Sequence, residues 1–218
     1  KLFSMAEIIP VIISSSVFPV LLKKLNEDRA SAMKFYNKVF LAYTFYGLLS
    51  FTFIYSFAEQ IVPFLFGSKY IITAKYCKEM FFTILIFPTA ILQANLIISL
   101  HREKIDMWLN ILSLVLNIVL SMIGLYFLKS ITAINIAIFI SFLLFHLLQD
   151  HILIKLNLLT FKVSILFYLT LFTALGMYYA ALSYFIPIVA FCLFWLCVSV
   201  LVGYYIHLYA KRQLSRAI

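Results

Sequence analysis

Two residues at the end of an apolar run, His146 and Asp150, are the pair in this sequence with the clearest capacity for chemistry. Side chains four residues apart lie on one face of a helix, so the two can interact. Histidine changes its charge near neutral pH, and an acid within a membrane span is costly, so such a pair could relay a proton. A role at the membrane interface is the simpler interpretation, and the sequence leaves both open.

Motifs of known enzymes are absent from the sequence. It contains no glycine-rich phosphate loop and no HExxH or GxSxG motif. The cysteines Cys77, Cys192 and Cys197 lack metal-ligand spacing, and the last two do not share a helical face. We therefore expect no enzymatic activity, no cofactor and no metal.

The elements that must position these residues are membrane-spanning helices. Hydrophobic residues make up 65% of the 218-residue chain and charged residues 11%, against about a quarter charged in soluble domains. The runs without Asp, Glu, Lys or Arg are 39–58, 80–101, 107–128, 130–149 and 163–210. One span needs about 20 apolar residues. The last run therefore fits two spans, hinged near Pro187, and 2–22 adds another. The sequence predicts an all-α, polytopic helical membrane protein with about seven transmembrane helices.

The distribution of basic residues predicts the orientation of the spans. If the spans alternate, one set of connections holds 12 of the 17 Lys and Arg residues, in 23–38, 101–106, 150–162 and 211–218. The positive-inside rule places this set, including the C-terminus, in the cytoplasm. Anchoring beside anionic lipid explains the net charge of +9 better than nucleic-acid binding does. We expect the lipid bilayer as a partner and no nucleic acid.

Polar residues inside the spans are candidates for lining a cavity. Glu7 lies one to two turns inside the first span, where it either faces protein or water or reaches the interface. Ser15 belongs to a run of three serines near Pro19, and serines there could satisfy a proline kink, allow close packing or line a cavity. Asn110 and Asn117 share one helical face, which indicates interhelical hydrogen bonds or a polar lumen.

Segment 59–78 follows the second span on the opposite side from the basic connections. It is apolar but interrupted by Pro63 and Gly67. We expect an amphipathic piece at the membrane interface with a turn at Gly67, which either caps the bundle or acts as an extracellular gate.

Two short elements follow one another along the chain: FPVL at 18–21, within SSSVFPVLLKKL, closes the first span, and LFGSKYIITA at 65–74 follows the next span. Their order resembles that of Wzx-type polysaccharide flippases. In that family an "fPvls" element closes a span of the second lobe, and an "lfG..Y..A" element follows the next span. HREK at 101–104 and the asparagines of the next span continue the resemblance. It covers 2–150, whereas 163–218 matches only in forming two more spans.

The resemblance implies a place in the multidrug/oligosaccharidyl-lipid/polysaccharide exporter superfamily, together with MATE transporters and the lipid II flippase. Such proteins alternate access between two lobes. Here 1–160 would supply part of the C-terminal lobe, and 161–218 would supply two further spans with a basic cytoplasmic tail. The N-terminal lobe would be the missing partner, because a chain that opens on Lys1 inside a hydrophobic pattern is expected to be a fragment.

The cargo implied by the resemblance is an undecaprenyl-pyrophosphate-linked oligosaccharide. It would move from the cytoplasmic to the outer leaflet of the bacterial inner membrane during O-antigen, lipopolysaccharide or capsule biosynthesis, driven in part of the family by an ion gradient. No Lys or Arg is expected at mid-membrane. Either the missing half supplies the cations, or the residues at the inner mouth attract the head group, namely Lys23, Lys24, Arg102 and Lys104.

Two other functions remain open from the sequence. A drug or small-molecule antiporter of the same superfamily would use the acids Glu7 and Asp150 to bind lipophilic cations. A membrane fragment without transport activity is the other, because seven helices without a partner lobe cannot alternate access by rocking one repeat against another.

Overall fold

The computed structural model describes residues 1–214 of the chain, with side chains up to Tyr204. Its long helices are α1 (Leu2–Glu27), α2 (Arg29–Phe66), α5 (Glu103–Leu128), α6 (Ile131–Lys155), α7 (Phe161–Tyr184) and α8 (Pro187–Leu214). The short elements are η1 (Ser68–Tyr70), α3 (Thr73–Met80), η2 (Phe81–Leu85) and α4 (Phe87–Ser99), of which α3, η2 and α4 make one span. Seven segments of the described chain are long and apolar enough to cross a membrane, and the described residues form no strand. The prediction of an all-α polytopic membrane protein is confirmed.

The chain divides into two compact units, Lys1–Ile165 and Leu166–Ile218. The first contains α1 to α6 and the beginning of α7. In the second, the remainder of α7 packs against α8, with the rings of Tyr178 and Phe194 in an edge-to-face arrangement at 5.5 Å between centroids. The side chains of the basic tail at 211–218 lie outside the described residues.

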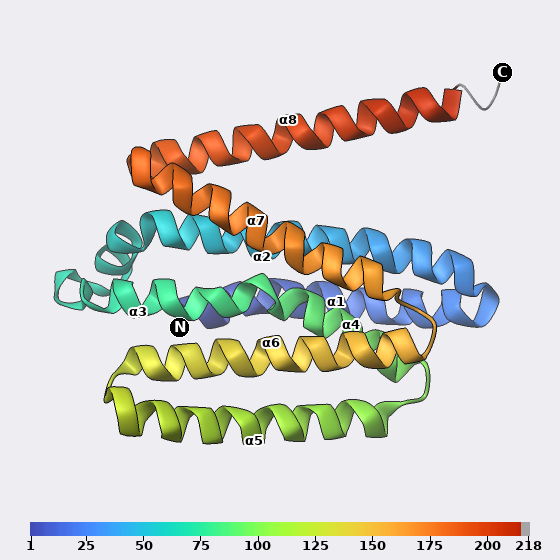
Figure 1. Cartoon of the computed structure of the whole chain (residues 1–218), viewed down its shortest axis with the longest axis horizontal. Helices are drawn as coiled ribbons and strands as arrows, with labels where there is room; N and C mark the ends of the chain where they lie inside the picture. Colours follow the sequence, from blue (N-terminus) through green and yellow to red (C-terminus); the bar gives the residue numbers. More distant parts are fainter. Residues whose placement is uncertain (215–218) are drawn as a thin grey trace. The chain divides into compact units, whose positions relative to one another are not determined.

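Within the first unit, successive connections alternate between the two ends of the bundle (Figure 1). The α1–α2, α4–α5 and α6–α7 connections lie at one end, and the α2–α3 and α5–α6 connections lie at the other. At the first end, Arg29 Nη2 donates a hydrogen bond to the carbonyl of Leu156, at 2.7 Å. Because these connections and the adjoining parts of the helices carry most of the basic residues of the unit, we call this end the basic end.

Local sequence signals explain where α2 begins and ends. Asp28 caps its first turn, because the carboxylate accepts hydrogen bonds from the backbone N–H groups of Ala30 and Ser31 at 2.9 and 3.0 Å. Gly67 ends the helix with a φ of 98°, a conformation that favours glycine. The expectation of a separate interfacial piece from residue 59 is wrong, since α2 continues to Phe66. Pro63 removes one hydrogen-bond donor from the last turn and does not stop the helix.

Two prolines lie within α1, and a tyrosine of α2 compensates for one of them. Pro10 has no N–H for the carbonyl of Ala6, and the hydroxyl of Tyr46 donates to that carbonyl at 2.6 Å.

The first serine of the run in α1 connects this helix to two others. Ser14 is buried and accepts hydrogen bonds from Tyr43 at 3.3 Å and from Asn95 at 3.0 Å, so it joins three helices.

We expect Tyr46→Phe to lower the free energy of unfolding by about 1 kcal/mol, because the Ala6 carbonyl loses its donor. Thermal unfolding of the purified protein in detergent measures the loss. In the Pro10→Ala background the backbone N–H of residue 10 can take over this bond, so the same tyrosine change should then cost much less. Equal losses in the two backgrounds would contradict the compensation.

Candidate functional site

A buried polar cluster lies between helices of the first unit, and we call it the polar cluster. Its side chains are each at most 7% exposed, although they come from four helices whose surroundings are apolar. Its members are Tyr36 of α2, Thr89 and Gln93 of α4, His146, Gln149 and Asp150 of α6, and Ser164 of α7.

Helical spacing positions the two halves of this cluster. His146, Gln149 and Asp150 are three and four residues apart, so they share the face of α6 that is turned toward α4. Thr89 and Gln93 are likewise four apart on α4 and meet them. The spacing on both helices brings the polar groups to one interface.

Hydrogen bonds tie α6 to α4 at three points and to α7 at one. Gln93 Nε2 donates to Asp150 Oδ1 at 2.6 Å, and the Ser164 hydroxyl donates to Asp150 Oδ2. His146 Nε2 lies 3.0 Å from Thr89 Oγ1. Gln149 Nε2 donates to the backbone carbonyl of Ala90, at 3.2 Å. His146 and Asp150 therefore lie buried between helices.

Asp150 has His146 one turn away on its own helix, and neither of the lysine ion pairs in the described part of the chain includes it. The two ion pairs found there are Lys23–Glu27 and Lys78–Glu59. A buried carboxylate without a counter-charge is costly in a membrane bundle. A proton or small cation that binds at Asp150 would relieve this cost.

Three buried oxygen atoms of the polar cluster make no hydrogen bond. They are the Tyr36 hydroxyl and the side-chain carbonyl oxygens of Gln93 and Gln149. Buried polar atoms nearly always form hydrogen bonds. An atom that forms none has lost its hydrogen bonds to water without gaining a replacement. The two amide oxygens and the Asp150 carboxylate are acceptors, whereas the Tyr36 hydroxyl can also donate.

The other predicted cavity-lining residues do not join the polar cluster. Glu7 is half-buried on α1 and Ser15 is exposed there, with its hydroxyl bonded to the Ile12 carbonyl at 2.7 Å. Asn110 donates to the backbone carbonyl and carboxylate of Asp106, and Asn117 accepts from Ser121. The interhelical bonds expected of Asn110 and Asn117 are thus replaced, among the described hydrogen bonds, by bonds within α5.

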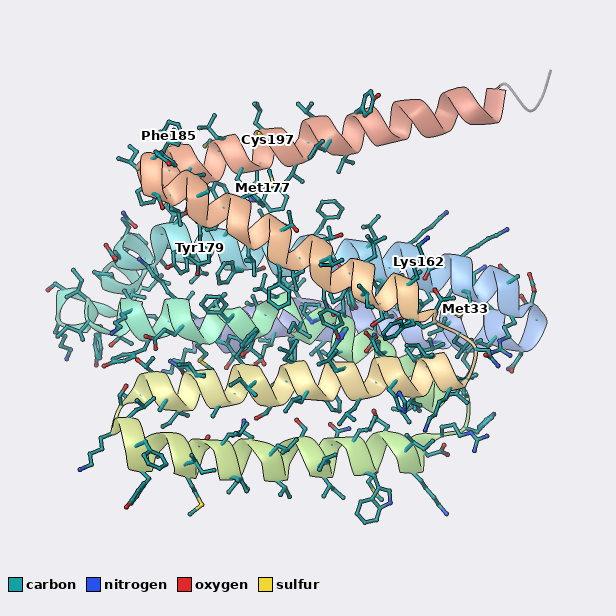
Figure 2. The ribbon with its side chains drawn as sticks, in the orientation of Figure 1. Met33, Lys162, Met177, Tyr179, Phe185 and Cys197 are labelled. Carbon is teal, nitrogen blue, oxygen red and sulfur yellow. The ribbon has the colours of Figure 1, made fainter. Side chains whose placement is uncertain are left out.

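The location of α5 explains these local bonds. The helix packs mainly on α6, and its other faces expose large apolar side chains, such as those of Leu114 and Met122. Side chains along α5 point away from α6 as well as toward it (Figure 2). Asn110 lies on an exposed face and bonds one turn away in its own helix, whereas Asn117 is half-buried and bonds Ser121 of α5.

The four predicted head-group residues lie at the basic end. Lys23 is exposed and forms a 3.9 Å ion pair with Glu27. Lys24 is half-buried, with its Nζ 3.5 Å from the hydroxyl of Ser31. The remaining two, Arg102 and Lys104, are exposed where α5 begins.

Sequence reasoning missed most members of the polar cluster. Thr89 and Gln93, four apart in an apolar span, carry the same signal as His146 and Asp150, and that spacing could have identified them. Gln149 beside Asp150 is a further signal. Tyr36 and Ser164 lie in segments far apart in the sequence, and no pattern in the sequence relates them to the other members.

The seven apolar helices and the buried polar cluster define the class of this protein as an all-α, polytopic membrane protein with a polar interior. A scan against protein-family models found no match, and searches of curated proteins and of solved structures found none either.

Proposed function

We propose that this chain is part of a membrane transporter that moves undecaprenyl-pyrophosphate-linked oligosaccharides from the cytoplasmic to the outer leaflet of the bacterial inner membrane. Such transport serves the biosynthesis of surface polysaccharide. Two lines of support are the motif resemblance over residues 2–150 and the polar cluster inside the bundle. In this proposal the C-terminus and the basic end are cytoplasmic, and a second lobe completes the cavity.

The observation that carries the proposal is Asp150, a buried acid that neither lysine ion pair of the described chain includes. A bundle with a purely structural role would be at least as stable with apolar residues at Asp150 and at both of its partners, Gln93 and Ser164. Ionisable groups within spans are typical of transport pathways and proton relays. Binding of a cation at Asp150 would change its bonds to Gln93 and Ser164, and so would couple the ion to the packing of α4, α6 and α7.

The four basic residues at the basic end give the proposal a test. We expect the double change Lys24→Gln and Arg102→Gln to lower glycan export about tenfold or more, because each basic group near a membrane surface contributes about 1 kcal/mol of attraction to anionic lipid. The measurement is complementation of a bacterial strain that lacks its own flippase, using the gene with any coding sequence upstream of Lys1.

Lys69 and Lys129 offer the matched control, since both are exposed and lie in connections at the other end of the first unit. Their replacement by glutamine removes the same charge, and export should stay unchanged. Full export with Lys24 and Arg102 neutralised would remove their proposed role in attracting the head group.

A small-molecule antiporter of the same superfamily is the second candidate. The burial of Asp150 favours it too, because a buried acid can bind an organic cation. Glu7, the other acid of that hypothesis, is half-buried on α1 and takes no part in the polar cluster. Efflux of a fluorescent lipophilic cation by the expressed protein, without complementation of glycan export, would favour the antiporter.

A further inference from the structure

A groove between α1 and α2 is independent of the polar cluster and of the proposed function. It has a volume of about 270 Å³ and lies wholly within the first unit. Its floor includes the buried residues Pro10, Val17 and Tyr43, and the exposed side chains of Ile9 and Ile13 form one rim. We call it the α1–α2 groove.

The groove is apolar although two tyrosines line it. The hydroxyl of Tyr43 donates to the Pro10 carbonyl at 2.9 Å, and that of Tyr46 donates to the Ala6 carbonyl at 2.6 Å. Both hydroxyls are therefore committed to the backbone of α1. The groove consequently offers hydrocarbon and aromatic surface, which suits an apolar chain rather than a polar ligand.

Lys38 is the charged residue that lines this groove. It lies five residues before Tyr43 on α2, about 7.5 Å nearer the basic end at 1.5 Å per residue. Its side chain is exposed, and neither ion pair of the described chain includes it. A lysine at this depth can extend its ammonium group toward the interface while its stem contacts apolar surface.

We propose that the α1–α2 groove binds an anionic phospholipid, with one acyl chain in the groove and the headgroup phosphate at Lys38. The chain matches the apolar floor, and the phosphate supplies the counter-charge that Lys38 lacks. A basic side chain near a membrane surface attracts anionic lipid head groups in this way. A protein helix in the groove would instead bury Lys38 and would need an acid to offset its charge.

Native mass spectrometry of the purified chain tests this assignment, with phosphatidylglycerol and phosphatidylcholine of identical acyl chains. We expect phosphatidylglycerol to be retained in preference to phosphatidylcholine. Lys38→Gln should weaken phosphatidylglycerol binding about fivefold, the equivalent of about 1 kcal/mol for one basic group, and should leave phosphatidylcholine unaffected. Lys34→Gln is the matched control, because Lys34 is exposed one turn earlier on the same helix and does not line the groove.

A second variant tests the groove itself and leaves the charge in place. Ala42 is exposed and lines the groove, so Ala42→Trp should fill it and reduce the binding of both lipids. Equal binding of the two lipids by the unaltered chain, or equal effects of the Lys38 and Lys34 changes, would overturn the proposal. A preference for undecaprenyl phosphate over phosphatidylglycerol would overturn the assignment of the occupant.

Discussion

Replacement of Gly47 by alanine lowers the free energy of unfolding by about 1–3 kcal/mol, the usual cost of an added methyl group in a well-packed core. Gly47 lies where α2 crosses η2, and a Cβ atom there would stand 2.6 Å from the Ile84 carbonyl oxygen and 3.2 Å from Leu85 Cα. Both are backbone atoms, which cannot rotate away as the end of a side chain can. Gly47→Leu should prevent stable packing of the two elements altogether.

Thermal unfolding in detergent measures this loss, and Gly176 supplies the control. It lies within α7, and a Cβ atom at that position would meet nothing within 4 Å. Gly176→Ala should therefore be neutral or stabilising by up to about 1 kcal/mol, since alanine favours the helix. Equal effects at the two glycines would show that α2 and η2 do not approach each other as closely as described.

Under the proposed function, Asp150→Asn should leave the protein folded and abolish glycan export. Asparagine has nearly the same shape and keeps one acceptor oxygen, so stability should stay within about 1 kcal/mol of the original. It cannot, however, take up a proton or supply negative charge to a cation. In the complementation assay we expect glycan export to fall at least tenfold, with unchanged amounts of protein in the membrane.

Asp106 is the matched control for this change. It lies half-buried on α5 and bonds Asn110 in its own helix, outside the polar cluster. Asp106→Asn should leave export unchanged. Asp150→Ala, which leaves the donors of Gln93 and Ser164 without their acceptor, should in contrast cost about 2–6 kcal/mol at 1–3 for each donor. Normal export by the Asp150→Asn variant would show that the polar cluster serves only to pack the helices together.

The sequence by itself determined the membrane class and the approximate spans. The thickness of the bilayer dictates how long an apolar run must be, so a run such as 107–128 identifies its own helix without reference to the rest of the chain. The break at Gly67 was predictable for a similar reason, because glycine there relieves a local backbone restriction. The extension of α2 through Pro63 was not predictable from the sequence. A proline in the last turn removes only one hydrogen-bond donor, and this loss does not end the helix.

Tertiary structure alone decided which polar residues meet. The rotation of a helix about its axis depends on the packing of its neighbours, and in a chain this apolar every face of a span looks alike. Asn110 and Asn117 were candidates from the sequence just as Asp150 was, yet the hydrogen bonds described for the two asparagines stay within α5, while α4 and α6 bury Asp150 together with Gln93. The runs of apolar residues set the class of the protein, and the packing of α2, α4, α6 and α7 set its interior chemistry.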